Sequence, residues 1–570
     1  MASGAYLTCA SSYTFDNNLT IVLASLLRPV PTLLLLLLAG ALALPVLVVL
    51  GSWVQWDAQT AQILREMAAT VLPEYLWVTV QLALMVGLGV VAMGVPAALL
   101  VTVFDFPGRR SFEWLLLLPL AMPAYVTAYA YTDFLQFSGP LQSWLRASFG
   151  LQGRLLPEVR SVWGAAWVFS FSLYPYVYLL ARTALVERAP QLMEAARLLG
   201  ASLPRRLREV ALPMARPAVA AGTALALMEV LADYGVSVYF GIQTFTAGIY
   251  KAWLSMDNRI AAAQLATVLL ALVVLLLWLE QRAQRRLRFA SASAARAGSG
   301  EARPVRLRGR RAALAWLLCL LPVLLGFVLP VLFMLRPLSA DWSVLPWERF
   351  LVWAWNSVRL GGMTALLALG AAWLLAFGLR RRPSLLRRGA VQLISLGYAV
   401  PGAVVVVGLL LPVGWLQARW PGSGAGALVT ASVLGLLWAY LVRFVSVALQ
   451  SVQSGYARVS HSLDESARLL GASGLELALQ VHWPLLRRAG LAAALLVFVD
   501  VMKELPATIV LRPFNTDTLA VVANQLARDE RLGEAALPSL ALVLVGLVPV
   551  VLLSRTLRAE RRAQGDAARV

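Results

Sequence analysis

The chain has 570 residues, of which 60% are hydrophobic and only 14% are charged, and its mean hydropathy is +0.74. Soluble proteins are roughly half apolar and a quarter charged, so this balance excludes an ordinary soluble protein and indicates an integral membrane protein. The net charge of +20 does not indicate a nucleic-acid partner, because the Lys and Arg residues lie mostly in short segments between apolar runs. We expect contact with membrane lipid and none with nucleic acid.

Apolar runs of about 20 residues, the length that crosses a membrane, occur twelve times. The first run is long and no Lys or Arg precedes Arg28, so we expect a retained membrane helix and not a cleaved signal peptide. The twelve predicted helices lie near 29–53, 75–103, 114–134, 161–182, 217–239, 261–279, 312–335, 354–379, 389–414, 424–442, 488–511 and 536–554.

An Arg-rich polar stretch at 280–311 divides the predicted helices into two groups of six and has the composition of a flexible basic linker. Arg-rich loops follow the even-numbered helices, which predicts that both termini are cytoplasmic. The predicted organisation is a cytoplasmic segment at 1–28, a first half at 29–279 with a core at about 75–279, the linker, a second half at 312–555 with a core at about 354–554, and a cytoplasmic tail at 556–570.

A charged phrase occurs once in each half, as EAARLLGAS at 194–202 and ESARLLGAS at 465–473. The offset is 465 − 194 = 271, and the same offset relates Gly200 to Gly471 and Pro213 to Pro484. A fixed register over some twenty residues indicates a duplicated unit. Because six helices separate the copies, the halves have the same orientation and form a parallel repeat.

Each copy of the phrase predicts a short cytoplasmic helix that ends at a left-handed glycine, followed by a second short segment closed by proline. An amphipathic loop of this kind often does no more than lie on the membrane interface. The duplication of Glu, Gly and Pro in fixed places favours a docking site for a partner instead.

The order Glu-Ala-Ala, three residues, Gly and then a Leu-Pro resembles the cytoplasmic EAA loop of type I ABC importer permeases. The resemblance implies an all-α, MetI-like fold of about twelve transmembrane helices, with two parallel six-helix repeats fused in one multi-pass chain of the bacterial inner membrane. In that family the loop couples the permease to its ATPase. The implied coupling residues are Glu194, Ala195, Ala196, Gly200 and Pro213 in the first copy, and Glu465, Ser466, Ala467, Gly471 and Pro484 in the second.

Two longer phrases, EVLADYGVSVYFGIQTFTAGIYKAW at 229–253 and DVMKELPATIVLRPFNTDTLA at 500–520, resemble segments of fused permeases for ferric iron. The resemblance implies ferric iron as substrate, a periplasmic substrate-binding protein that delivers it, and two copies of an ATPase subunit. Thiamine, polyamines, sulfate and phosphonate remain alternative substrates.

Sequence patterns for bond chemistry are absent. A phosphate-binding loop needs a Gly-Lys pair, and neither Lys251 nor Lys503 follows a glycine. We therefore expect no enzyme activity, no catalytic residue and no cofactor in this chain, with ATP used by partner subunits. The isolated Cys9 and Cys319 give no support to a disulfide or a zinc site. An ion-coupled secondary transporter or a channel is the rival interpretation, and a membrane enzyme is a weaker one.

Carboxylates interrupt predicted helices 5 and 11, and the offset of 271 pairs Glu229 with Asp500 and Asp233 with Glu504. At about 1.5 Å per residue from the start of helix 5, Glu229 is about 18 Å and Asp233 about 24 Å deep in a core of about 30 Å. Charges at that depth need a partner or a watery cavity. Two interpretations stay open: with Tyr234 the carboxylates line a translocation path, or they brace helices. We assign no metal ligand.

A proline also recurs within two predicted membrane helices, in Ala121-Met122-Pro123 and Ala399-Val400-Pro401. Proline removes one backbone hydrogen bond and kinks a helix. Either a hinge or a static bend is compatible with this pattern.

Overall fold

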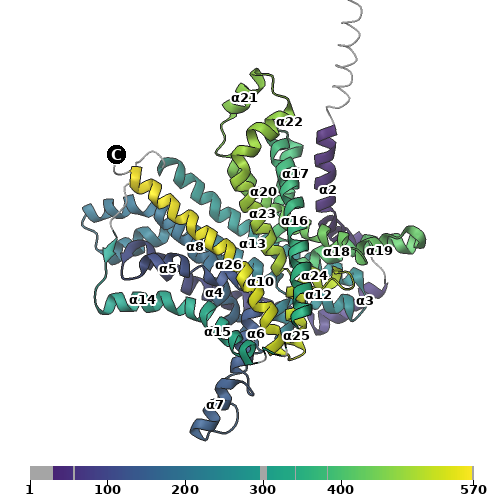
Figure 1. Cartoon of the computed structure of the whole chain (residues 1–570), viewed down its shortest axis with the longest axis horizontal. Coiled ribbons are helices and arrows are strands. Elements are labelled where there is room, and N and C mark those ends of the chain that lie inside the picture. The colour runs from purple at the N-terminus through teal and green to yellow at the C-terminus, as the bar shows by residue number, and fades with distance from the viewer. Residues whose placement is uncertain are drawn as a thin grey trace, which may run out of the picture. The chain divides into compact units, whose positions relative to one another are not determined.

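A computed structural model describes residues 30–54, 58–294, 304–340, 342–343, 345–381 and 383–567. Almost all of them are helical (Figure 1), which confirms the all-α prediction. The predicted N-terminal segment at 1–28, including Cys9, lies outside the described residues, as do 295–303 in the predicted linker.

The elements before residue 295 are helices apart from one two-residue strand. They are α2 (Val30–Gly51), η1 (Ser52–Val54), α3 (Ala58–Thr70), α4 (Leu72–Val103), β1 (Phe104–Asp105), α5 (Arg109–Leu115), η2 (Leu118–Ala121), α6 (Ala124–Leu135), α7 (Pro140–Phe149), α8 (Val162–Leu198), α9 (Leu203–Arg206), η3 (Leu207–Ala211), α10 (Leu212–Ala232), α11 (Gly235–Tyr239), α12 (Phe245–Leu254) and α13 (Arg259–Ala294).

The elements after residue 303 have the same character. They are β2 (Val305–Arg306), α14 (Arg310–Val323), η4 (Leu324–Val328), α15 (Leu329–Ala340), α16 (Trp347–Arg381), α17 (Leu385–Ser395), η5 (Gly397–Ala399), α18 (Gly402–Arg419), η6 (Pro421–Ser423), α19 (Ala425–Thr430), α20 (Val433–Tyr456), α21 (His461–Leu469), α22 (Gly474–Glu476), η7 (Leu477–His482), α23 (Trp483–Lys503), α24 (Pro506–Leu511), α25 (Leu519–Arg528) and α26 (Leu532–Ala567).

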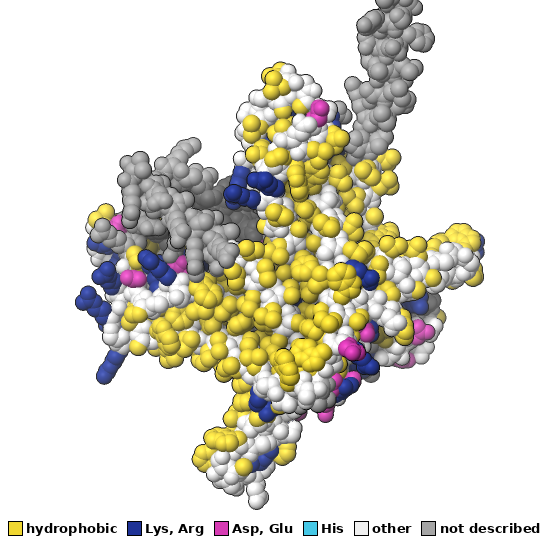
Figure 2. All heavy atoms as spheres, viewed as in Figure 1, with side chains coloured by type: hydrophobic (Ala, Val, Ile, Leu, Met, Phe, Trp, Pro, Cys, Tyr) yellow, Lys and Arg dark blue, Asp and Glu magenta, His cyan; other side chains and the backbone are white. Residues whose placement is uncertain are grey.

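Among the described residues, ten helices are long and apolar enough to cross a membrane, or eleven if the bent pair of helical segments at 109–149 forms one span. The predicted helix at 488–511 corresponds to α23, which has 21 residues but also carries four charged side chains, Arg487, Arg488, Asp500 and Lys503. Hydrophobic side chains cover much of the visible surface (Figure 2). Leu84 and Leu88 of α4 are among the exposed hydrophobic side chains of the molecule. Such a surface suits hydrocarbon and not water.

The predicted linker and tail contain more regular structure than we expected. Helix α13 continues to Ala294, and α26 continues to Ala567. Near the end of the predicted linker, β2 pairs in parallel with β1, and the Leu307 N–H donates to the Asp105 carbonyl at 2.9 Å. The Ala and Arg residues of these stretches favour helix, which explains why the helices extend beyond the apolar runs.

The prolines of predicted helices 3 and 9 end one helix and begin another. Met122 is extended (φ −102°, ψ 120°), and Pro123 (ψ 141°) precedes the first residue of α6. The helical segments before and after this point are bent by 87°. Pro401 has the same backbone angles (φ −57°, ψ 142°) before α18. Proline disfavours the helical conformation at the residue before it, so each predicted continuous helix is broken.

The chain divides into two compact units that do not coincide with the two sequence halves. One unit contains residues up to Leu47, Gly362–Tyr398 and Tyr440–Phe498, and the other contains Val48–Gly361, Ala399–Ala439 and Val499–Val570. The larger unit therefore holds most of the first half together with α24, α25 and α26 of the second. In its core the Asn524 amide donates to the Tyr129 hydroxyl at 2.7 Å, and both side chains are buried.

Glycines allow close packing of α4, α8 and α10 in the larger unit. A Cβ at Gly94 would lie 2.8 Å from the Val177 Cβ, and a Cβ at Gly222 would lie 2.7 Å from the Val177 Cα. Helix backbones approach this closely in membranes only where small residues meet. Gly222 therefore fixes the distance between α10 and α8.

We expect Gly222→Ala to lower the thermal unfolding midpoint in detergent, because its methyl group would overlap the α8 backbone and not a movable side-chain end. Overpacking of this kind costs about 1–3 kcal/mol. Gly362→Ala in α16 is the matched control, since a Cβ there meets nothing within 4 Å. Equal midpoints for the two variants would contradict the packing argument.

Candidate functional site

The two repeated phrases end their helices in the same way. Gly200 has φ +80° and Gly471 has φ +86°, so the predicted left-handed conformation is confirmed at both positions. The Ala201 N–H donates to the Ala196 carbonyl at 2.9 Å, and the Ala472 N–H donates to the Ala467 carbonyl at 3.0 Å. These bonds satisfy carbonyls at the helix end, and a side chain at the glycine would be strained.

The second segment of each loop is not closed by proline as predicted. In both copies one π-helical turn, η3 or η7, leads directly into the following long helix. The Leu212 N–H donates to Leu207, and the Trp483 N–H donates to Ala478, each across five residues. A proline in an α-helix clashes with the carbonyl four residues earlier. The wider turn avoids that clash, so the helix passes through Pro213 and Pro484.

The copies differ in how the chain enters the phrase. In the first copy α8 runs without interruption from Val162 to Leu198, so the phrase is the end of a membrane helix. In the second copy α20 ends at Tyr456, and α21 begins anew at His461. The sequence identity of the two phrases gave no indication of this difference.

Several side chains of both phrases are exposed. Glu194 pairs with Arg197 at 3.4 Å and keeps 44% of its side chain exposed, and Glu465 is also exposed. A pair of leucines before each glycine is almost fully exposed, and these side chains were missed in the sequence analysis: Leu198 81%, Leu199 88%, Leu469 89% and Leu470 89%. Leucines just before a helix-ending glycine, present in both copies, were the available signal. Exposed apolar pairs beside a charge are typical of a protein-binding surface.

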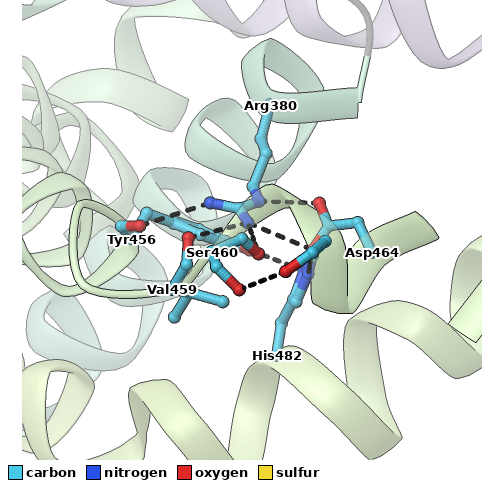
Figure 3. A network of polar contacts seen from close by, with 7 residues as sticks. Arg380, Tyr456, Val459, Ser460, Asp464 and His482 are labelled. Carbon is cyan, nitrogen blue, oxygen red and sulfur yellow. Dashed lines mark hydrogen bonds and ion pairs between the residues drawn. The ribbon is translucent and has the colours of Figure 1, made fainter. Parts of the chain in front are cut away.

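A buried polar cluster supports the second phrase, and we call Arg380, Tyr456, Asp464 and His482 the Arg380 cluster (Figure 3). Nε and Nη2 of Arg380 bind the Asp464 carboxylate at 2.8 and 3.1 Å. His482 Nε2 lies 2.9 Å from the same carboxylate, and His482 Nδ1 lies 3.2 Å from the Tyr456 hydroxyl. The side chains of Arg380, Asp464 and His482 are 8%, 6% and 1% exposed.

Asp464 stays ionised in this cluster. Burial raises the pKa of its carboxyl group, but the hydrogen bonds from Arg380 and His482 more than offset burial, so its pKa lies below the ordinary value. Its ion pair therefore stabilises the fold above the pKa of the unfolded chain and loses that contribution as pH falls through the folded pKa. Removal of one partner would leave an uncompensated buried charge, at a cost of about 3–5 kcal/mol.

Two of the predicted path carboxylates cap helices at equivalent places. The Asp233 carboxylate accepts bonds from Val236 N–H at 3.0 Å and Ser237 N–H at 3.2 Å, at the start of α11. The Glu504 carboxylate accepts bonds from Ala507 N–H at 3.0 Å and Thr508 N–H at 3.1 Å, at the start of α24. The offset of 271 relates both pairs of donors as well as the carboxylates. These contacts match the bracing interpretation, since each carboxylate satisfies N–H groups that the helix itself leaves unpaired.

The other two path carboxylates lie near a buried cation. Glu229 and Asp500 are close enough to attract the Lys503 ammonium group. Lys503 Nζ also donates to the Leu120 carbonyl at 2.9 Å, at the helix break before Pro123. The Lys503 ammonium group therefore has two carboxylates nearby and one backbone carbonyl as a hydrogen-bond acceptor, and that carbonyl lies at the helix break.

Tyr234, the remaining path residue, lies just before α11, with its ring 4.4 Å from that of Tyr250. The Tyr250 hydroxyl donates to the Pro506 carbonyl at 2.8 Å, which links α12 to the start of α24. Within the described part of the chain, no three His, Cys, Asp or Glu side chains are grouped closely enough to hold a metal ion.

Comparisons with known proteins relate the chain to transport proteins. The family model for the binding-protein-dependent transport system inner membrane component matches residues 91–289. The Fe(3+)-transport system permease protein FbpB 2 of Haemophilus influenzae is 24% identical over 92% of this chain and 97% of its own length. The probable ABC transporter permease protein y4fN of Sinorhizobium fredii is 26% identical over 91% and 92%. The sulfate transport system permease protein CysW of Escherichia coli is 30% identical over 40% of this chain and 77% of its own length.

We expect Asp233→Ala to destabilise the protein by about 0.5–2 kcal/mol, the usual cost of losing a helix cap. Asp233→Asn should cost clearly less, because its amide oxygen still accepts from the N–H groups of α11. Thermal unfolding in detergent measures both. The equivalent pair Glu504→Ala and Glu504→Gln should rank in the same order, and equal losses for the amide and alanine variants would contradict the capping role.

Proposed function

Because the chain belongs to the family of binding-protein-dependent transport system inner membrane components, we propose that this ABC importer permease, with two membrane domains fused in one chain, carries ferric iron. The observation that carries the coupling part of the proposal is the pair of exposed loops with the same left-handed glycine and the same π-helical turn. The chain is a transport subunit and not an enzyme, and ATP is hydrolysed in separate subunits.

In the proposed arrangement, one ATPase subunit docks on each loop, so that two copies serve one permease chain. Glu194 and Glu465 supply the charged contact, and the neighbouring exposed leucines supply the apolar contact. Gly200 and Gly471 make the bend that presents them. This arrangement requires both loops and both termini to be cytoplasmic, while a periplasmic binding protein delivers the substrate on the other side. The chain itself binds no cofactor.

The assignment of ferric iron as substrate rests on sequence similarity along nearly the full length of the chain. The similarity to the H. influenzae ferric permease extends over both halves, whereas the similarity to the E. coli sulfate permease covers 40% of the chain. Sulfate, an anion, is therefore the principal competitor, and thiamine, polyamines and phosphonate are further alternatives. Oxygen ligands suit a hard cation such as ferric ion.

The candidate translocation path lies beside the helix breaks of the larger unit, where Glu229, Asp233, Tyr234, Asp500 and Glu504 occur. Asp233 and Glu504 act there through the backbone they hold, since N–H groups occupy their carboxylates. We propose that Glu229 and Asp500 contact a passing cation, and that this contact replaces their attraction to the Lys503 ammonium group.

Charge reversal in the loops tests coupling. We expect Glu194→Arg or Glu465→Arg to weaken binding of the ATPase subunit at least about tenfold, which corresponds to about 1.4 kcal/mol, while the protein still inserts into the membrane. Co-purification of the ATPase with the tagged permease measures this. Glu66→Arg, at an exposed glutamate of α3 outside both loops, is the matched control. Unchanged co-purification of both loop variants would refute the docking role.

Substrate identity is tested by uptake of radiolabelled ferric ion into cells with and without the permease, in the presence of its binding protein and ATPase. We expect uptake only with the permease, and loss of uptake on ATP depletion. Radiolabelled sulfate, tested in parallel, should not accumulate. Sulfate uptake without ferric uptake would overturn the ferric assignment, and ferric uptake driven by an ion gradient without ATP would favour a secondary transporter.

A further inference from the structure

The Arg380 cluster joins four segments of the smaller unit at one point. Arg380 lies at the end of α16, Tyr456 ends α20, Asp464 belongs to α21, and His482 belongs to η7. Besides the Asp464 carboxylate, the Arg380 guanidinium binds the carbonyls of Tyr456, Val459 and Ser460, at 3.2, 3.0 and 2.9 Å (Figure 3). The Tyr456 carbonyl also accepts from the Val459 N–H at 3.0 Å. At the break between α20 and α21, one side chain of α16 thus supplies a hydrogen-bond partner to three backbone carbonyls.

His482 links the remaining members of the cluster. Its Nε2 lies 2.9 Å from the Asp464 carboxylate and its Nδ1 lies 3.2 Å from the Tyr456 hydroxyl, so one imidazole joins both side chains. The Tyr456 ring also lies beneath the guanidinium, 5.2 Å from the Arg380 Cζ to the ring centroid. Every polar group of the cluster thus has a partner in one arrangement, which gives α21 a single position relative to the end of α16.

At the described positions equivalent to Arg380, Asp464 and His482, the first half lacks the side chains of this cluster. The offset of 271 places Met193 where the second half has Asp464, and Ala211 where it has His482, and both are buried apolar residues. Equivalent residues of α4 and α16 are 278 positions apart, as are Pro123 and Pro401. Thr102 is therefore the first-half equivalent of Arg380. The Thr102 hydroxyl binds the Ala98 carbonyl of its own helix at 2.7 Å. The first phrase needs no such anchor, because α8 itself continues into it.

We propose that the Arg380 cluster is a positioning device, which fixes the second coupling helix α21 to α16 and makes the two coupling loops mechanically different. The role in coupling rests on the proposed function above. Movement of the first loop passes directly into α8, whereas movement of α21 passes through the Arg380–Asp464 contact into α16. Loss of the contact therefore disconnects hydrolysis from transport in the second half without removing the surface on which the ATPase docks.

Hydrogen exchange of the full chain in detergent tests the anchor without any partner. We expect Asp464→Asn and Arg380→Gln each to raise amide exchange in 461–469 at least tenfold, while 194–200 in the first phrase stays unchanged. Because both variants break the Arg380–Asp464 contact, the increase in the double variant should be smaller than the product of the two single increases. Unchanged exchange in 461–469 would overturn the proposal even if the ATPase docks as expected.

Reconstituted vesicles with the ATPase subunit and the binding protein test transmission. We expect the two variants to retain ATPase binding and hydrolysis but to transport at least fivefold less radiolabelled ferric ion per ATP. Arg380→Lys, which keeps the charge, should recover part of this ratio. Equal loss of transport and hydrolysis, or an unchanged ratio, would overturn the positioning role. Absence of ATPase binding to the unmodified chain would instead refute the proposed function and leave the exchange result standing.

Two further variants make the comparison specific. Arg388→Gln removes an exposed arginine of α17, which has no part in the cluster, and should leave exchange and the transport ratio as in the unmodified chain. Tyr456→Phe removes only the hydroxyl that contacts His482, so it avoids a buried unpaired charge if the other variants fail to fold. A faster exchange of 461–469 in Tyr456→Phe would support the proposal, and no change would contradict it.

Discussion

The constraint on which this structure depends is that backbone N–H and C=O groups need hydrogen-bond partners where no water is present. Inside a bilayer an unpaired N–H or C=O costs several kcal/mol, so a helix that breaks must be supplied with substitutes. The chain breaks its helices repeatedly, at Pro123, at Pro401 and before α11 and α24. At each break before α11 and α24 a carboxylate serves the new helix, and at Leu120 an ammonium group serves an old one. Three charged side chains near these breaks, Asp233, Glu504 and Lys503, thereby bind backbone groups.

The same physical need explains why the two halves differ in their cytoplasmic loops. The first phrase extends α8, so its carbonyls are paired within the helix. The second phrase follows a break, and the Val459 and Ser460 carbonyls at that break are bound by Arg380 from another helix. The two near-identical phrases are thus held by different structural elements. The two halves can differ in this way because they are fused in one chain, so each half is always paired with the same other half.

In the proposed ferric transport, Glu229 and Asp500 have a second use. Glu229 and Asp500 both attract the Lys503 ammonium group. A cation that passes them would compete with a fixed ammonium group, so any binding would be weak. Weak binding is what a transport path needs, since a tight site would retain its substrate.

The local patterns of the sequence were sufficient for the membrane class, the parallel repeat and the left-handed Gly200 and Gly471, because hydrophobic length, register and glycine conformation are properties of neighbouring residues. They were insufficient wherever a partner came from a distant segment. The anchoring of α21 by Arg380 depends on such tertiary contacts, whereas the π-helical turn before Pro213 and the cap by Asp233 are local features that the apolar pattern does not reveal. Arg380 looked like a topology signal, since nothing within its own helix reveals that its guanidinium serves the carbonyls of Val459 and Ser460, some eighty residues away. Tertiary structure alone decided which charges are structural, because burial beside a particular backbone group gives a charge its role.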